Sequence, residues 1–345
     1  MLRLVISLLA FFLLIPSPFT QSFSFFWQDK DGGKDLKPLA PMHHNDSNSC
    51  VLRHGETGAP VPHRVLLLLD SKYFEVFQNW LMYYKGVCPG EASDKNLEIV
   101  CMDIAVTDML HNHTALRCSP HYTAPSPASI SVSNAASSFK SSVWIKRLEI
   151  INMFLMQQQD VLVSDTDAFW LRSPYTDLTL LSEQSDIVAS RGWFPIHISE
   201  QWGSTLCMGF LYIKASDFTR DVFNRVLGDM HLTNLQARAR QHFLSTQNNT
   251  YIDPDHPERA AFVFNADTYG TKGIKEADDQ WSLNTVLFHS NLTFPEDMVL
   301  AYREQRHTGQ LIWGNASSVF NVTLLPESLY VRNCANNLLK HLGRA

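Results

Sequence analysis

The stretch from Ser141 to Pro174 constrains the fold more than any other part of this chain. Its first half carries apolar residues at the spacing of one α-helix face, at Trp144, Leu148, Ile151 and Leu155. A run of glutamines ends that pattern, and the apolar run Val161–Val163 follows without polar alternation. Such a run is typical of a strand covered on both faces. The sequence therefore predicts a helix, a turn and a buried strand, with Asp165-Thr166-Asp167 directly after the strand.

The two aspartates after this strand are candidate ligands for a cation. In an extended chain, residues two apart point to the same side, so we expect Asp165 and Asp167 to face one ion. Open α/β sheets bind ligands at the carboxyl ends of their strands. A D-x-D triplet alone is a weak signal, because the chain holds two others, at Asp29–Asp31 and Asp253–Asp255. Only the pair at Asp165 and Asp167 follows a predicted helix and strand, so a metal and phosphate site is expected there.

Strands and helices also alternate in the rest of the chain. Before the D-x-D triplet we expect a strand, a helix, a strand and a helix, at Val65–Leu69, Tyr73–Lys85, Leu97–Met102 and Ala105–His111. After it we expect strands at Ile187–Ala189 and Leu206–Lys214, and helices at Asp217–Met230 and Ala277–Phe288. This order predicts an α/β fold with a doubly wound, Rossmann-like, mostly parallel sheet in a single domain.

The sequence also predicts the local structure of three other segments. Ser119–Ser138, rich in Ser, Pro and Ala, is expected to be a long loop, either a lid or plain surface. Trp193–Trp202 is expected to be an aromatic-bearing loop. Gly209 lies inside a predicted strand, where a glycine usually marks a bulge or a close approach to the backbone.

Charge and motif content exclude several function classes. A formal net charge of −6 without a basic run argues against a nucleic-acid partner. The sequence has no P-loop, no GxGxxG fingerprint, no nucleophile elbow and no HExxH. These absences count against P-loop, dinucleotide-binding, α/β-hydrolase and zincin proteins.

The N-terminal region predicts entry into the secretory pathway. Residues 1–27 read as a cleaved signal peptide or as a type II signal anchor that would attach the chain to a membrane. Residues 28–63, with four prolines and little periodicity, read as a stem. Six N-x-[ST] sequons suit a luminal chain, at Asn45, Asn112, Asn248, Asn291, Asn315 and Asn321. The six cysteines allow up to three disulfides in that compartment, with pairings that the sequence leaves open.

The order of these motifs resembles that of a known family. The helix, VLVSDTDAFWLRSP, LCMGFLYIKAS and DDQWSLNTVL together are similar to the nucleotide-diphospho-sugar transferase domain of glycosyltransferase family 77. The resemblance covers Arg64–Val331 and leaves 332–345 as a C-terminal tail. It implies a GT-A fold, a nucleotide-diphosphate sugar donor, a glycan or glycoprotein acceptor, a divalent metal (Mn²⁺ or Mg²⁺) and retention of anomeric configuration. It also implies a Golgi membrane protein with a luminal catalytic domain, with secretion as the alternative.

The resemblance assigns further site residues beside the Asp165 and Asp167 metal pair. Lys146 and Arg147 precede the strand, and Lys146 is the better candidate for the nucleotide sugar because the family has a lysine in this segment. Arg191, at the end of a predicted strand, has a similar claim. Alternatively, Lys146 and Arg191 are each an ordinary solvated charge.

The element DDQ opens the last predicted helix. Asp279 and Gln280 resemble the family's residues at the sugar, which gives them a catalytic role, whereas an acidic helix start is also favoured by the helix dipole alone. Trp193 and Trp202 could each stack on an acceptor sugar or simply pack in the core.

One departure from the family concerns the metal site. Related enzymes often supply a C-terminal histidine to the metal or diphosphate, and this chain has Asn333 near that place. A non-catalytic GT-A-fold protein that binds a glycan or a partner is therefore the alternative function. An unrelated metal-dependent hydrolase is a weaker one, because no histidine cluster accompanies the two aspartates.

Overall fold

The computed structural model describes residues 50–53, 57–90, 94–122, 135–254, 257, 260–265, 278–294, 307–312 and 319–326. The expected N-terminal segment 1–27 and tail 332–345 lie outside these residues. Cys50 and Leu52, within the expected stem, are buried in the core, so packing begins before Arg64. Within the described ranges, no helix is both long and apolar enough to cross a membrane.

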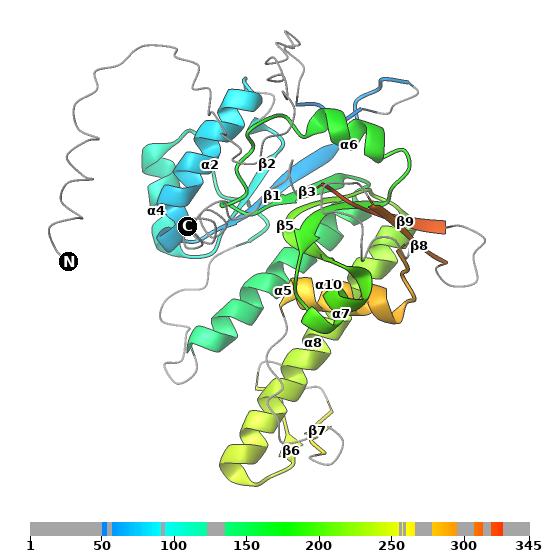
Figure 1. The fold of residues 1–345 in the computed structure, drawn as a ribbon. Coiled ribbons are helices and arrows are strands. Elements are labelled where there is room, and N and C mark those ends of the chain that lie inside the picture. The colour runs from blue at the N-terminus through cyan, green and yellow to red at the C-terminus, as the bar shows by residue number, and fades with distance from the viewer. Residues whose placement is uncertain are drawn as a thin grey trace, which may run out of the picture. The chain divides into compact units, whose positions relative to one another are not determined.

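One seven-stranded sheet organises the described residues, with the strand order β2-β1-β3-β5-β4-β9-β8 (Figure 1). Five of these strands point the same way, while β5 and β8 run antiparallel to their neighbours. The expected α/β fold with a mostly parallel sheet is thus confirmed. The strands span His63–Leu69 (β1), Leu97–Cys101 (β2), Asp160–Ser164 (β3), Ile187–Gly192 (β4), Thr205–Ile213 (β5), His307–Ile312 (β8) and Val319–Leu324 (β9). A separate small ribbon pairs β6 (Thr250–Tyr251) with β7 (Phe262–Val263).

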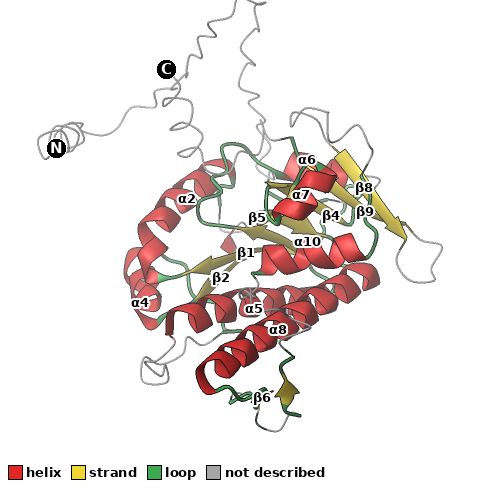
Figure 2. Cartoon of the chain, turned by 60° about the horizontal axis from the view of Figure 1, so that its bottom comes forward, coloured by secondary structure: helices red, strands yellow, loops and turns green. Residues whose placement is uncertain are grey.

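Helices cover both faces of the sheet. One core cluster lies against α5 (Ala135–Met156), α8 (Asp217–Thr246) and α10 (Asp279–His289), which Figure 2 shows together. The other lies against α2 (Phe74–Val87), α4 (Ile104–His113) and α6 (Tyr175–Leu181). A 3-10 turn, η1 (Ser71–Tyr73), leads into α2, and a short helix, α7 (Ile196–Trp202), follows β4.

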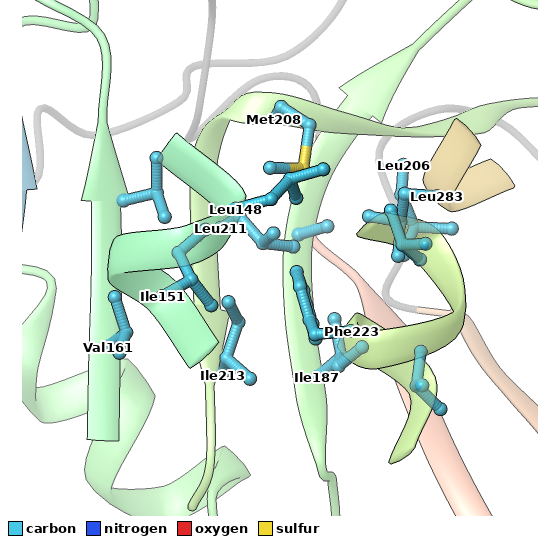
Figure 3. Close-up of a cluster of buried hydrophobic side chains, with 14 of the residues drawn as sticks. Leu148, Ile151, Val161, Ile187, Leu206, Met208, Leu211, Ile213, Phe223 and Leu283 are labelled. Carbon is cyan, nitrogen blue, oxygen red and sulfur yellow. The ribbon is translucent and has the colours of Figure 1, made fainter. Parts of the chain in front are cut away.

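The buried strand before the D-x-D triplet forms as predicted. Val161 and Val163 of β3 belong to the cluster under α5, whereas Leu162 belongs to the opposite one. On α5, Leu148 and Ile151 pack into the same cluster as Val161 (Figure 3). Because β3 is covered on both faces, an apolar run without alternation is what the fold requires there.

The glycine inside β5 lies in a β-bulge. Ala189 pairs with Leu211, but the next residue of β4, Ser190, pairs with Cys207, so the register shifts across Met208–Phe210. The side-chain alternation of β5 shifts with it: Met208 and Leu211, three residues apart, face the same core cluster. The expectation that Gly209 marks a bulge is confirmed.

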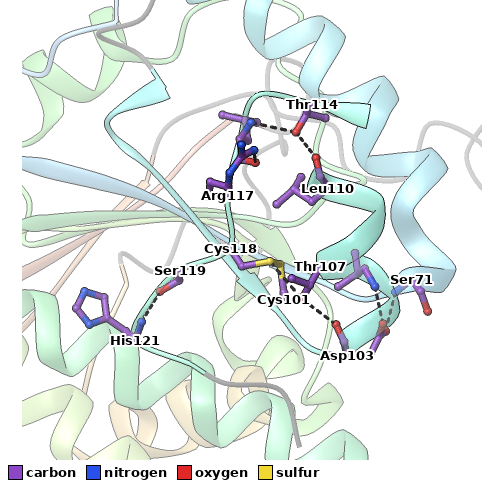
Figure 4. Close-up of a disulfide and its surroundings, with 12 residues drawn as sticks. Ser71, Cys101, Asp103, Thr107, Leu110, Thr114, Arg117, Cys118, Ser119 and His121 are labelled. Carbon is purple, nitrogen blue, oxygen red and sulfur yellow. Dashed lines mark hydrogen bonds between the residues drawn. A yellow bond between two sulfur atoms is a disulfide. The ribbon is translucent and has the colours of Figure 1, made fainter. Parts of the chain in front are cut away.

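Two disulfides tie down the segments around β2. Cys101 is bonded to Cys118 (Figure 4), and Cys50 is bonded to Cys88 at the end of α2. Beside the first bridge, the Ser119 N–H donates to the Ile99 carbonyl at 2.7 Å. The chain after α4 therefore covers the outer edge of β2, which no other strand pairs in the described part of the chain.

Several elements differ from the sequence expectation. The expected loop at Trp193–Trp202 is wrong over most of its length, because α7 occupies Ile196–Trp202. Pro195 precedes the helix, and Gly203, in the left-handed region, follows it. Proline at a helix start and glycine just past its end are recognised helix signals. α5 starts at Ala135, inside the expected loop Ser119–Ser138, of which 123–134 lie outside the described residues.

Candidate functional site

A buried arginine joins three elements at the carboxyl end of β3. Arg147 lies on α5 with only 3% of its surface exposed. Its Nη1 donates to Asp165 Oδ1 at 2.9 Å, and its Nε forms an ion pair with Asp279 Oδ2 at the start of α10. The guanidinium also lies 4.6 Å from the ring centroid of Trp144. Asp165 and Asp279, which are far apart in the sequence, are thus held by one side chain.

The D-x-D triplet adopts a turn. The Ala168 N–H donates to the Asp165 carbonyl at 3.0 Å, as in a β-turn, so the expected extended geometry is wrong. The Asp165 N–H donates to the Gly209 carbonyl at 2.8 Å. The bulge in β5 therefore anchors the first aspartate directly, because the backbone of β5 departs from regular pairing at that point.

Aromatic packing holds the chain after this turn. Trp170 is 4% exposed, and its ring lies 5.7 Å from Trp80 and 5.2 Å from Tyr84 of α2. The Trp80 Nε1–H donates to Ser164 Oγ at 3.1 Å, at the last residue of β3. Residues on both sides of the triplet are therefore fixed to α2, and the turn can hold its carboxylates in place.

Asp279 is a buried carboxylate at a helix start. It is 2% exposed, and burial raises its pKa, an effect that the Arg147 guanidinium opposes. The preceding Asp278 caps α10 by accepting the Trp281 N–H at 2.6 Å. Capping is thus the role of Asp278, whereas Asp279 points to Arg147, so the helix dipole alone does not account for the second acidic residue.

Gln280 contacts the loop that follows β4. Its Nε2 donates to the Phe194 carbonyl at 2.9 Å, and the Met208 N–H lies 3.4 Å from its Oε1. Gly192 approaches the same amide closely: a Cβ there would lie 3.0 Å from Gln280 Nε2 and 2.9 Å from Thr205 Oγ1. The absence of a side chain at Gly192 therefore leaves room for Gln280.

Asp165 and Asp167 have the chemistry of a divalent-cation site. Carboxylate oxygens suit Mn²⁺ and Mg²⁺, and both residues are partly exposed, with 23% of the Asp165 side chain accessible. Among the described residues, no group of three His, Cys, Asp or Glu side chains could hold a metal. The donor chemistry of the pair suits such an ion, and the remaining ligands would come from water, from a diphosphate or from residues outside the described part.

The other sequence-predicted residues fall in different surroundings. The Lys146 ammonium pairs with Glu149 and lies 5.6 Å from the Tyr122 ring centroid. Arg191 Nε donates to the Leu325 carbonyl at 3.1 Å, near the end of β9. The contacts with Asp165 and Asp279 belong to Arg147, the neighbour of Lys146.

Sequence reasoning ranked Arg147 below Lys146, although the spacing carried a signal. Arg147 lies three positions after Trp144 and four before Ile151, on the apolar face of α5. A charged residue on a buried helix face needs a charged or polar partner. The carboxylates of Asp165 and Asp279 fill that role.

Comparison with known proteins shows a family similarity over part of the chain. Residues 93–236 match the model of the nucleotide-diphospho-sugar transferases, a region that includes α5, β3 and the D-x-D turn but ends before α10. No curated protein matches the chain.

Two solved structures are similar in part. They are the glycosyltransferase GlyE in Streptococcus pneumoniae TIGR4, at 13% identity and a TM-score of 0.29, and apo mouse xyloside xylosyltransferase 1, at 11% and 0.35. The first likeness covers 61% of this chain and 46% of that one, and the second covers 66% and 82%. The chain thus spans less than half the length of GlyE, and neither likeness is close enough to align individual residues. The resemblance seen in the sequence is confirmed at the level of this match: residues 93–236 are similar to the nucleotide-diphospho-sugar transferases, while a place in glycosyltransferase family 77 stays a prediction.

Proposed function

We propose that this chain is a metal-dependent glycosyltransferase that moves a sugar from a nucleotide-diphosphate sugar to a glycan or glycoprotein, with retention of anomeric configuration. The family match supports sugar transfer as the general activity. The observation that carries the proposal is the buried Arg147, which brings the carboxylate after β3 and the carboxylate of α10 to one place. Retention rests on the resemblance of the sequence motifs alone.

The roles divide along the donor molecule. A divalent ion, Mn²⁺ or Mg²⁺, held by Asp165 and Asp167 would supply positive charge for the departing diphosphate. Asp279 and Gln280 would face the sugar, where a fixed charge and an amide can stabilise an oxocarbenium-like centre. Arg147 is a positioning residue in this scheme, because its guanidinium fixes Asp165 and Asp279 relative to each other.

Two basic residues remain candidates for the nucleotide. Lys146 and Arg191 each carry a positive charge near elements of the site, and each already has one protein partner. A diphosphate would compete with those partners for the cation. We keep both as proposed donor contacts, with a weaker claim than Asp165 and Asp167.

The cellular setting belongs to the same proposal. Two disulfides favour an oxidising compartment over the cytosol. Residues 1–27 would enter the secretory pathway and, if uncleaved, hold the chain at the Golgi membrane with its catalytic domain in the lumen. Secretion is the outcome if the segment is cleaved.

The proposal is tested by measuring nucleotide binding with and without Mn²⁺. Isothermal titration of the parent with uridine and guanosine diphosphates should show binding to one of them that requires Mn²⁺. Asp165→Asn and Asp167→Asn should each weaken this binding about 10²-fold, since each removes a charged ligand from a partly exposed site. Asp108→Asn, which removes an exposed charge from α4, is the matched control and should bind like the parent.

Two results separate the possible functions. Equal binding by the parent and both D-x-D variants would overturn the metal assignment. Incubation of the parent with nucleotide sugars and Mn²⁺ then tests catalysis, because an enzyme releases nucleoside diphosphate slowly even without acceptor. Nucleotide binding without any release from a broad donor panel would replace the enzyme by the alternative, a GT-A-fold binding protein.

A further inference from the structure

We infer that the segment from Gly192 to Ile196 is the acceptor platform of the site, and that Trp193 is the side chain on which a sugar ring of the acceptor stacks. This inference rests on the proposed function, because it names the second substrate of the same site. It also separates two tryptophans that the sequence leaves equivalent.

The two tryptophans differ in exposure. Trp193 is 48% exposed just after β4, whereas Trp202 is 6% exposed and packs against Phe288 and Phe294. Phe194 and Ile196, beside Trp193, are 42% and 64% exposed. Large apolar side chains that gather on a surface mark an interaction site more often than scattered ones do. Trp202 is therefore a core residue, and the exposed group is Trp193, Phe194 and Ile196.

One member of this group, Phe194, contacts the start of α10 directly. The Phe194 carbonyl accepts from Gln280 Nε2 at 2.9 Å, and the Phe194 ring lies 5.1 Å from the Trp281 ring. Gly192, at the other side of Trp193, lies against the same amide, since a Cβ there would be 3.0 Å from Gln280 Nε2. Trp193 thus lies between two residues that touch Gln280, the neighbour of Asp279.

The chemistry of the surroundings selects the occupant. A nucleoside diphosphate is held by charges, which Asp165, Arg147 and Asp279 concentrate where α5, the turn after β3 and α10 meet. The charged residue next to the platform, Arg191, donates from its Nε to the Leu325 carbonyl. A pyranose ring has an apolar face of C–H groups that packs on an aromatic ring while its rim of hydroxyls bonds to polar groups. Since Gln280 is proposed to face the donor sugar, an apolar surface beside it suits the incoming sugar.

The inference is tested with a glycan array. The full chain, supplied with Mn²⁺ and the nucleoside diphosphate that it binds, is applied as the parent, as Trp193→Ala, as Trp193→Phe and as Leu232→Ala. Leu232 is 49% exposed on α8, so its variant controls for the loss of an exposed apolar side chain. We expect the parent and Leu232→Ala to bind the same glycans, Trp193→Ala to bind them at least about tenfold more weakly, and Trp193→Phe to fall between.

A second measurement distinguishes a failure of this inference from a failure of the proposed function. Titration of the nucleoside diphosphate should give the same affinity for the parent and Trp193→Ala, because the tryptophan is assigned to the acceptor. A weaker nucleotide affinity would make Trp193 a stacking surface for the base and overturn the inference. The inference also falls if no glycan binds the parent, or if Trp193→Ala binds as well as the parent. The proposed function fails separately, if the parent binds no nucleotide.

Discussion

At the scale of single residues, the site depends on an arginine that is nearly removed from water. Desolvating a charge is costly, so Arg147 is stable inside the protein only because Asp165 and Asp279 neutralise it. The same logic applies to Asp279, whose pKa burial raises and Arg147 lowers. Arg147 therefore favours the ionised form of Asp279, and Asp279 neutralises the buried guanidinium, so removal of either residue should destabilise the other.

A double-mutant cycle measures this mutual dependence. Arg147→Met leaves Asp279 buried without its guanidinium, which should reduce the free energy of unfolding by about 3–5 kcal/mol. Adding Asp279→Leu removes the unpaired charge, so the double variant should recover most of that loss. Urea unfolding of the parent, both single variants and the double variant gives the coupling directly.

The pH dependence of the same series has a definite sign. Loss of Arg147 removes a group that lowers the Asp279 pKa, so in Arg147→Met that pKa should rise further above its unfolded value. A carboxyl whose folded pKa is raised destabilises the protein above that pKa, and the penalty vanishes below the unfolded value of about 4. The deficit of Arg147→Met should therefore be smaller at pH 5 than at pH 8. A deficit that stays constant with pH, or survives in the double variant, would mean that Asp279 is not the residue left unpaired.

At the scale of elements, the sequence predicted the parts whose burial is regular. The face of α5 that includes Leu148 and Ile151, and the β3 run Val161–Val163, follow periodicities that depend only on the local chain. The bulge at Gly209 was predicted for a similar reason, since a glycine interrupts an apolar strand.

Elements that depend on distant partners were not predicted. β8 pairs with β9, and β9 pairs with β4, more than 100 residues earlier in the chain. The place of both strands in the sheet is set by partners that the local sequence does not contain. The site itself shows the same limit. The carboxylates were identified from motifs, but the ion pairs from Arg147 to Asp165 and Asp279 arise from packing between α5, β3 and α10.

The close approach at the end of β4 can be tested with glycine substitutions. Gly192→Ala would place a Cβ 2.9 Å from Thr205 Oγ1 and 3.0 Å from Gln280 Nε2, so at least one of these two side chains should be displaced. We expect a loss of about 1–3 kcal/mol in the free energy of unfolding, the usual cost of overpacking. Gly228→Ala is the matched control: it lies in α8 with nothing within 4 Å of its Cβ, and should gain about 0.5–1 kcal/mol.

A second variant identifies the neighbour that gives way. In a Gln280→Ala background the amide is gone, so Gly192→Ala should cost less than it does in the parent. Thermal or urea unfolding of the four chains measures this difference. If Gly192→Ala reduces the free energy of unfolding equally in both backgrounds, the clash is with Thr205 and the backbone. Gly192 would then have no part in placing Gln280.

At the scale of the whole molecule, the disulfides and the sequons bear on the same compartment. Cys50–Cys88 joins the segment before β1 to the end of α2, and Cys101–Cys118 joins β2 to the chain that covers its edge. Bridges of this kind persist where the surroundings are oxidising. N-glycosylation takes place in the same compartment, and in the folded protein the asparagines of the sequons differ in how exposed they are.

Glycan occupancy should therefore follow the surface of the described residues. Asn112, Asn248 and Asn291 are exposed and should carry N-glycans. Asn321 should not, because its Oδ1 accepts from Gln310 Nε2 across the β8–β9 pair and the Thr323 of its sequon is 1% exposed. Treatment of the secreted or membrane-associated chain with an amidase in H₂¹⁸O, followed by peptide mass spectrometry, marks each occupied asparagine as labelled aspartate. Label at none of the sites would remove the luminal placement, whereas label at Asn321 would leave the lumen in place and contradict the expected protection of that sequon.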